Sequence, residues 1–242
     1  MKKILALLII TTILVSIPLV SAVNSKPSLS KVVFVHKEQD FVKPPNVGKP
    51  PKDDASDAYE LLGKNVKWQE TCLTFVINPS NDDGLLSAFV ESTIVAATVE
   101  WDEYTSADIF VSYSVDENTV IDGDEPDGDN EIVFGNIEDE GVIAMCVVWG
   151  IFLGPPSTRK IVEFDIMFDD FDYAWGDATA NDELMDLQNI ATHELGHGLG
   201  LADLYDLDLQ EQTMYGRATE GETIKRDLAS GDIAGIQFLY GK

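Results

Sequence analysis

The residues with the clearest capacity for chemistry lie in the stretch HELGHGLGLAD at positions 193–203. His193 and His197 are four residues apart, so both imidazoles lie on one face of a helix and can bind one zinc ion. Glu194 can then take a proton from a water that the zinc activates for attack on a peptide carbonyl. The alternative is an amphipathic helix that carries two histidines by chance. The sequence has 3 histidines, and two of them are in this motif, which favours the metal site.

A glycine and two aspartates after the histidines bear on the third zinc ligand. Gly200, three residues after His197, can adopt a left-handed conformation and end the helix in a sharp turn. The turn would bring Asp203 back toward the metal, and Asp206 is the competing candidate. A carboxylate oxygen binds zinc at a distance similar to that of an imidazole nitrogen, so an aspartate can complete the site. Met214 follows in QTMYG, where a tight turn would place its side chain beneath the metal.

These residues resemble the motif of the metzincins, and within them of the matrixin-like metalloproteases. The family pattern H-E-x-x-H-x-x-G-x-x-H is matched at His193, Glu194, His197 and Gly200. The similarity also covers KWQETCLTFVINPS, DIMFDDFDYAWG, ATHELGHGLGL and GDIAGIQFLYG, and so spans nearly all of 67–242. A chance H-E-x-x-H would not be accompanied by these further segments.

The sequence departs from most of the family at Asp203, where the pattern has a third histidine. Snapalysin-like relatives use an aspartate at this position. Asp206 comes too late for the family spacing. The resemblance therefore implies a zinc ion held by His193, His197 and Asp203.

The resemblance also implies roles for residues around the metal. Met214 would be a structural support beneath the site rather than a ligand. Tyr215 is adjacent to this methionine, not two residues after it, so core packing is a better interpretation than a role in transition-state stabilisation. The segment 141–150 would be the antiparallel edge of the sheet, which lines the cleft and pairs with the extended backbone of a substrate.

The pattern of apolar residues around the motif predicts one α/β domain with a mixed sheet. β-rich segments recur along the chain, and two helices follow them, separated by an irregular acidic stretch. We expect strands at 72–79, 108–115, 131–137, 141–150 and 160–170, and helices at 83–103, 184–199 and 231–240, with Asn181, Asp182 and Ser230 as capping candidates. The resemblance implies the metzincin fold, a mixed five-stranded sheet with an active-site helix and a C-terminal helix.

The N-terminal part of the chain has a different composition. Lys2 and Lys3, an apolar run at 4–20 and small residues up to Ala22 predict a secretory signal peptide at 1–22. A retained membrane anchor is the alternative, but the run is shorter than the roughly 20 apolar residues that span a bilayer. Residues 23–66 contain KPPNVGKPPKDD and predict a flexible arm, with a short prosegment as the alternative, before a catalytic domain at 67–242.

Two residues of the N-terminal half bear on how such an enzyme could be silenced. Longer prosegments in the family use a cysteine to silence the zinc, but no cysteine precedes Cys72, so a cysteine switch is unsupported. His36 could mask the metal, although an exposed histidine on a flexible arm is the expected state.

The formal net charge of −27 argues against nucleic acid or anionic membrane as a partner, because phosphates would be repelled. It fits a secreted, monomeric protein that acts on extended peptides or proteins. Calcium is a second candidate cofactor, because the loop IDGDEPDGDN offers hard oxygen ligands on a turn. A solvated acidic hairpin tip is the alternative, since the spacing differs from an EF-hand. The candidate calcium ligands are Asp122, Asp124, Asp127 and Asp129.

The sequence has 2 cysteines, Cys72 and Cys146, and an even number in an exported chain suggests a disulfide. The strand order of metzincins, however, would place two strands between them. Three spacings of about 4.8 Å exceed the Cα separation of under about 7 Å that a disulfide tolerates. We therefore expect both thiols to be free.

Taken with the resemblance, the residues predict a secreted zinc-dependent endopeptidase in which Glu194 is the general base and then the general acid. One rival is a zinc-binding protein of the same fold without activity, which the intact Glu194 disfavours. The other is a calcium-dependent surface or adhesion module, suggested by the acidity and the loop aspartates.

Overall fold

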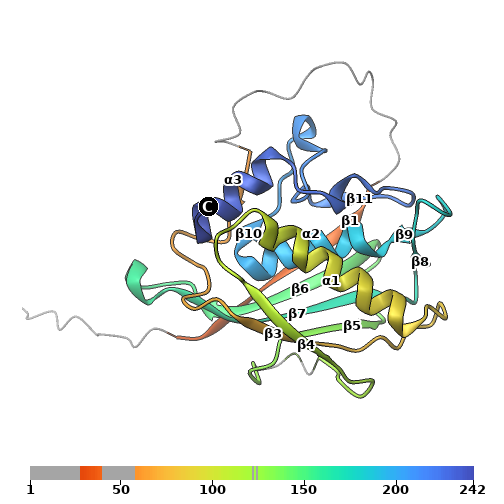
Figure 1. The fold of residues 1–242 in the computed structure, drawn as a ribbon, viewed down its shortest axis with the longest axis horizontal. Helices are drawn as coiled ribbons and strands as arrows, with labels where there is room; N and C mark the ends of the chain where they lie inside the picture. The colour runs from red at the N-terminus through yellow and green to blue at the C-terminus, as the bar shows by residue number, and fades with distance from the viewer. Residues whose placement is uncertain (1–27, 40–57, 122, 124) are drawn as a thin grey trace, which may run out of the picture.

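The fold is built on one mixed sheet, seen in a computed structural model that describes residues 28–39, 58–121, 123 and 125–242. Seven strands pair in the order β11-β1-β6-β7-β5-β3-β4 (Figure 1). β6 runs antiparallel to its neighbours β1 and β7, whereas the other pairs in the sheet are parallel. The strands are β1 (Ser30–Glu38), β3 (Leu73–Ile77), β4 (Phe110–Val115), β5 (Glu131–Gly135), β6 (Val142–Ile151), β7 (Lys160–Asp169) and β11 (Arg217–Ala218).

Two short pairs and three helices complete the domain. The pairs are β2 (Glu60–Leu61) with β10 (Leu201–Ala202), and β8 (Trp175–Gly176) with β9 (Met185–Asp186). The helices are α1 (Ser87–Glu103), α2 (Leu187–Leu199) and α3 (Ser230–Tyr240). Short 3₁₀ turns lie at Pro156–Thr158, Leu207–Leu209 and Ile224–Arg226.

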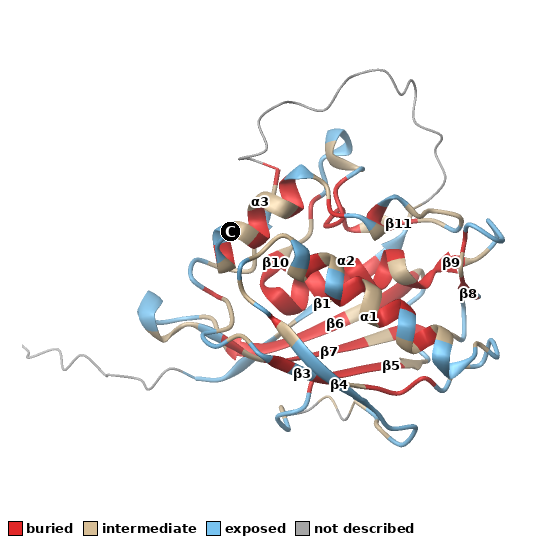
Figure 2. Cartoon of the chain, viewed as in Figure 1, coloured by how far each residue is buried: buried red, intermediate tan, exposed pale blue. Residues whose placement is uncertain are grey.

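The core lies between the central strands and the two helices packed over one face of the sheet, as the buried residues in Figure 2 show. Trp101 of α1, Phe164 and Ile166 of β7 and Leu195 of α2 are fully buried there. The indole of Trp101 donates a hydrogen bond of 2.8 Å to the carbonyl of Thr192, which joins α1 to α2 in the core. Because α2 is buried along nearly its whole length, side chains on it are held in fixed positions.

Specific residues determine where α2 begins and ends. The carboxylate of Asp186 accepts a hydrogen bond from the amide of Asn189 and caps the first turn. At the other end Gly200 has a φ of 107°, a left-handed conformation that a side chain would strain. Its amide bonds to the carbonyls of Gly196 and His197, so the chain turns sharply after Leu199.

The expected mixed α/β fold is confirmed, and the five predicted strands and three helices occur in the predicted order. The sheet has seven strands rather than five, because β1 and β11 join it. Two differences matter for function. The segment 141–150 is not an edge of the sheet, because β1 pairs along it. The helix α2 begins at Leu187 rather than 184, because Met185 and Asp186 pair with β8, and its cap is Asp186 instead of Asn181 or Asp182.

Both cysteines are free, as expected. Cys72 directly precedes β3 and Cys146 lies in β6, and strands β5 and β7 separate these two strands in the sheet. Cys146 is buried and Cys72 is exposed. The two thiols therefore differ in accessibility.

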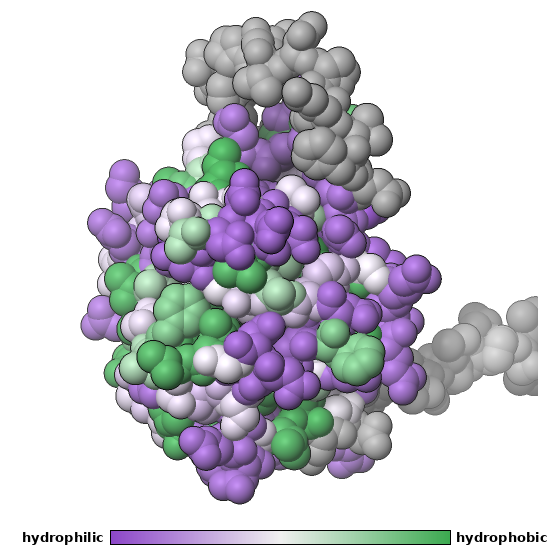
Figure 3. Space-filling view, turned by 90° about the vertical axis from the view of Figure 1, so that its right-hand side faces the viewer, coloured by the Kyte–Doolittle hydropathy of each residue, from purple (hydrophilic) through white to green (hydrophobic). Residues whose placement is uncertain are grey.

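Hydrophilic and hydrophobic residues are interspersed over the face of the molecule drawn in Figure 3. Within the described ranges, no helix combines the length and the apolar character needed to cross a membrane. The predicted signal peptide at 1–22 lies outside the described residues.

Candidate active site

The helix α2 presents His193 and His197 on one face, one helical turn apart. Both side chains are completely buried, and their Nε2 atoms lie 3.1 Å from each other. The Nδ1 of His193 lies 2.7 Å from the carbonyl oxygen of Thr213, and the Nδ1 of His197 lies 3.0 Å from that of Leu201. A carbonyl oxygen only accepts, so each Nδ1 carries the proton and each Nε2 presents a lone pair.

Asp203 adds a third acceptor to this pair. Its Oδ1 lies 3.3 Å from Nε2 of His193 and 3.4 Å from Nε2 of His197. The chain turns at Gly200 and continues in the short strand β10, and Asp203 directly follows that strand. Its carboxylate therefore faces the histidines of α2. Burial would raise the pKa of Asp203, but its interactions with the two histidines outweigh burial and hold that pKa well below its usual value. Burial is also the main reason that the pKa of His193 is lowered, to about 4.

Three acceptor atoms that converge without a proton between them fit a cation. In a tetrahedral zinc site, ligand atoms about 2.0–2.1 Å from the ion lie about 3.3 Å from one another. The separations of 3.1, 3.3 and 3.4 Å among the three atoms match this geometry. Two nitrogens and one carboxylate oxygen are also a donor set that zinc accepts. His193, His197 and Asp203 therefore have the geometry and the chemistry of a zinc site.

The competing aspartate lies elsewhere. Asp206 caps the 3₁₀ turn Leu207–Leu209, where its carboxylate accepts a hydrogen bond of 3.0 Å from the amide of Asp208. Asp203 belongs to a group of three side chains whose potential ligand atoms lie within 4.8 Å of one another. Within the described part of the chain, Asp206 belongs to no such group.

A tyrosine holds the second carboxylate oxygen of Asp203. The hydroxyl of Tyr205 donates a hydrogen bond of 3.0 Å to Oδ2 of Asp203. This leaves Oδ1 directed at the histidines, so the carboxylate is oriented to bind through one oxygen. Gly216 lies against the same carboxylate, because a Cβ at this position would be 2.6 Å from Oδ1 of Asp203.

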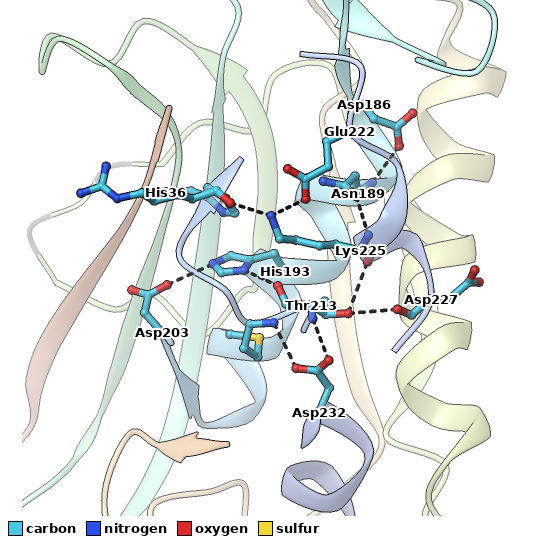
Figure 4. Close-up of polar contacts among 12 residues, drawn as sticks. His36, Asp186, Asn189, His193, Asp203, Thr213, Glu222, Lys225, Asp227 and Asp232 are labelled. Carbon is cyan, nitrogen blue, oxygen red and sulfur yellow. Dashed lines mark hydrogen bonds and ion pairs between the residues drawn. The ribbon is translucent and has the colours of Figure 1, made fainter. Parts of the chain in front are cut away.

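The turn at residues 212–216, the Met214 turn, holds His193 through the carbonyl of Thr213 and packs against Gly196 of α2. Met214 is buried and packs against Gly196, where an added Cβ would clash with the methionine Sδ and lie 2.8 Å from Cζ2 of Trp101. The carboxylate of Asp232 in α3 accepts hydrogen bonds from the amides of Thr213 at 2.7 Å and of Met214 at 3.0 Å (Figure 4). Asp232 thereby fixes the carbonyl that accepts from His193.

A buried lysine joins this turn to the start of α2. The amide of Lys225 donates a hydrogen bond of 2.7 Å to the side-chain oxygen of Asn189 (Figure 4). Its Nζ donates to the carbonyl of Arg217 and pairs with Glu222. Burial lowers the pKa of Lys225, against the opposing effect of Glu222.

Strand β1 contacts both histidines through aromatic rings. The ring of Phe34 stacks on His197 with centroids 3.9 Å apart and planes 5° apart. The ring of His36 meets His193 at 3.9 Å with an interplanar angle of 65°. The expectation that His36 is an exposed histidine on a flexible arm is wrong, because its side chain is completely buried. The segment 23–66 contains the paired strands β1 and β2 where a flexible arm was expected.

Glu194 lies next to His36 and follows His193 in α2. Its Oε1 is 3.3 Å from Nδ1 of His36, and within the described residues neither of its oxygens has a hydrogen-bond partner. Burial, and then the negative charge of Asp203, raise the pKa of Glu194 well above its usual value. His36, His193 and Glu194 form a second group of three potential ligand atoms within 4.8 Å of one another.

The candidate calcium loop does not form a comparable cluster in the described residues. Asp122 and Asp124 lie outside them. Asp127 and Asp129 are exposed, and the Oδ1 of Asp127 accepts a hydrogen bond of 2.9 Å from the amide of Asp129.

Three residues that shape the site, Asp232, Tyr205 and Phe34, were given no role from the sequence, and the fourth, His36, was considered as a mask for the metal but expected to be exposed. Asp232 and Tyr205 act through hydrogen bonds, and Phe34 and His36 act through ring contacts. Asp232 carried a usable signal, since an acidic residue in the first turn of α3 is free to bind amides before that helix. The alternation of apolar residues in SKVVFVHKE was an equivalent signal for β1.

Comparisons with known proteins find similarity to one family of metalloproteinases. The family model of Matrixin matches residues 67–241. Metalloendoproteinase 2-MMP of Arabidopsis thaliana is 29% identical over 190 residues, which cover 76% of this chain and 45% of that protein. Neutrophil collagenase of Homo sapiens is 31% identical over 204 residues, which cover 84% of this chain and 38% of that protein. The chain thus spans less than half the length of these relatives.

Proposed function

Because the chain belongs to the matrixin family, we propose that it is a zinc-dependent endopeptidase whose zinc is held by His193, His197 and Asp203. The observation that carries the proposal is the convergence of two unprotonated Nε2 atoms and one carboxylate oxygen at 3.1–3.4 Å. Zinc bound there would polarise a peptide carbonyl and make a water acidic enough to be deprotonated near neutral pH.

Glu194 is the proton carrier in this proposal. It is outside the ligand set but lies beside His193 on α2, so its carboxylate can accept a proton from the attacking water. The same group then delivers that proton to the amide nitrogen that leaves. The hydrogen bonds to Thr213, Leu201 and Tyr205 hold the three ligands in orientation during both steps.

The proposed substrate is an extended peptide or protein that would pair with β6 in the place that β1 occupies in this structure. An extended backbone can form ladder hydrogen bonds with a strand of any sequence, and side-chain pockets then set the specificity. A pocket of about 270 Å³ lies beside the site, lined by Val35, Lys37, Tyr205, Gly216 and Arg217. Val35 and Lys37 belong to β1, so the pocket has this lining only while β1 pairs with β6.

The remaining features of the proposal concern the whole chain. We propose secretion through the signal peptide at 1–22, a short prosegment within 23–66 and a monomeric catalytic domain at 67–242. Amino-terminal sequencing of the exported form tests the two boundaries. Calcium at the 121–130 loop stays a prediction, which a rise in melting temperature on addition of calcium would support.

Replacement of Glu194 by Gln tests the proposed function. The Glu194→Gln protein should retain zinc, because the carboxylate is not a ligand, and should lose about 10²-fold or more in casein hydrolysis. Zinc content and chelator-sensitive hydrolysis are the two measurements. Turnover near that of the unsubstituted chain would refute the role of Glu194, and a chain that binds zinc without any hydrolysis would be an idle member of the family.

A further inference from the structure

We infer that strand β1 is a built-in occupant of the peptide-binding edge of β6 and keeps the active site closed. The inference rests on the proposed function, since it assigns a regulation to the same site. It concerns the segment Ser30–Glu38, which the sequence alone assigned to a flexible arm.

The first argument is the backbone pairing. β1 runs antiparallel to β6 over nearly its whole length, from Ser30 opposite Gly150 to Lys37 opposite Val142. On its other side β1 pairs with β11 in parallel, through Lys37 opposite Arg217. A peptide bound by strand addition uses the same unpaired amides and carbonyls of the sheet edge. While β1 is in place, these groups of β6 are engaged and an extended substrate has no ladder to join.

The second argument is the position of two β1 side chains. Phe34 lies flat on the ring of His197, and His36 contacts His193 with its Nδ1 3.3 Å from Oε1 of Glu194. The imidazole of His36 therefore fills the space next to the proposed proton carrier. A water or a substrate carbonyl needs that space, so β1 blocks the chemistry as well as the peptide-binding edge.

The third argument is that β1 is separable from the core. Within β1 only the side chain of His36 is fully buried, and Val33 is 46% exposed. Phe34 is partly buried against the core, whereas the strands on the far side of β6 contribute fully buried residues such as Phe164 and Ile166. Departure of β1 would expose the site without removing any large side chain from the main core.

The test uses the full chain with substitutions in β1. In a strand, the amides of alternate residues donate hydrogen bonds to the same neighbouring strand. Proline has no amide hydrogen, so one of the two variants Val32→Pro and Val33→Pro removes a hydrogen bond to β6. His36→Ala removes the ring beside Glu194 and leaves the backbone intact. Val33→Thr is the matched control, because it keeps the β-branched shape, the amide and the exposed position. Thermal melting of each protein identifies variants that fail to fold.

Two readouts separate this inference from the proposed function. In zinc-free protein, the labelling rate of Cys146 by a thiol reagent reports on β1, since Phe34 is opposite Cys146 in the ladder and burial raises the pKa of that thiol. Exposed Cys72 is the internal reference. In zinc-loaded protein, kcat/KM for an extended fluorogenic peptide is measured, and each variant is repeated with Glu194→Gln to show that hydrolysis comes from this site.

We expect Cys146 to be labelled faster in one or both proline variants than in the unsubstituted chain. These variants and His36→Ala should hydrolyse the peptide about tenfold faster, because strand pairing or ring contacts are lost. Val33→Thr should match the unsubstituted chain in both assays. Equal hydrolysis by the unsubstituted chain and all folded variants would overturn the inference and leave the proposed function intact. Faster labelling without hydrolysis in any variant would support occupancy of the edge by β1 and refute the peptidase.

Discussion

The Met214 turn contacts His193 and strand β1 contacts both His193 and His197, and the two do so with different interactions. On the side of the turn, the carbonyl of Thr213 accepts from His193, and Asp232 in turn binds the amides of Thr213 and Met214. On the side of β1, Phe34 and His36 make ring contacts. Neither nitrogen of His36 has a hydrogen-bond partner among the described residues.

The contacts of the turn orient the imidazole rings, whereas the contacts of β1 cover them. Hydrogen bonds with fixed donors and acceptors determine the tautomer and the direction of each imidazole, and an apolar replacement cannot reproduce them. Ring contacts exclude water with little directional demand, so another flat or apolar group can take their place. The turn is therefore suited to hold ligands permanently, and β1 is suited to be exchanged for a substrate.

A loss of stability is expected when the contact between α2 and the turn is overpacked. Gly196→Ala would place a methyl group into Met214 and Trp101, and overpacking of this kind costs about 1–3 kcal/mol. Alanine favours the helix by about 1 kcal/mol over glycine, so a net loss of stability would measure the packing. The measurement is the free energy of unfolding in denaturant. In a Met214→Ala background the same Gly196→Ala change should cost less, and an equal cost in both backgrounds would show that the turn is not the partner.

A pH-dependent effect is expected at Asp232, whose pKa burial raises to about 6 in spite of three backbone hydrogen bonds. A folded-state pKa above the unfolded value means that this group loses stabilising free energy as the pH rises from about 4 to about 6. Two pKa units correspond to about 3 kcal/mol. Asp232→Asn does not titrate, so its stability relative to the unsubstituted chain should improve by about that amount between pH 4 and pH 7. A pH-independent difference would contradict the assignment.

A smaller effect is expected at Tyr205. Tyr205→Phe removes the hydrogen bond to Oδ2 of Asp203, and loss of such a support to a ligand typically weakens metal binding by about 10-fold or more. Competition with a chromophoric chelator gives the zinc affinity. Tyr215→Phe is the control, since Tyr215 is a buried residue of the Met214 turn that contacts Lys225 rather than a ligand. Equal losses in both variants would mean that Tyr205 acts through general packing.

The two sides of the site also differ in how far the sequence predicted them. His193, Glu194, His197, Gly200 and Asp203 lie within eleven residues, and helix periodicity with one left-handed glycine is enough to bring them together. Strand β1 pairs with a segment more than a hundred residues away, and such pairing depends on the tertiary fold. The Pro- and Lys-rich composition at 43–54 outweighed the short apolar alternation before it, so the strand was assigned to a flexible arm.

Zinc content is the measurement that tests the central claim most directly, because the account depends on the ligand set. After dialysis against a weak chelator, the unsubstituted chain should retain about one zinc ion per chain, as a site with three protein ligands does. Asp203→Ala should lose the metal, Asp203→His should keep it, and Asp206→Ala should behave like the unsubstituted chain. Loss of zinc in Asp206→Ala with retention in Asp203→Ala would contradict the assignment of the third ligand and the geometry built on it.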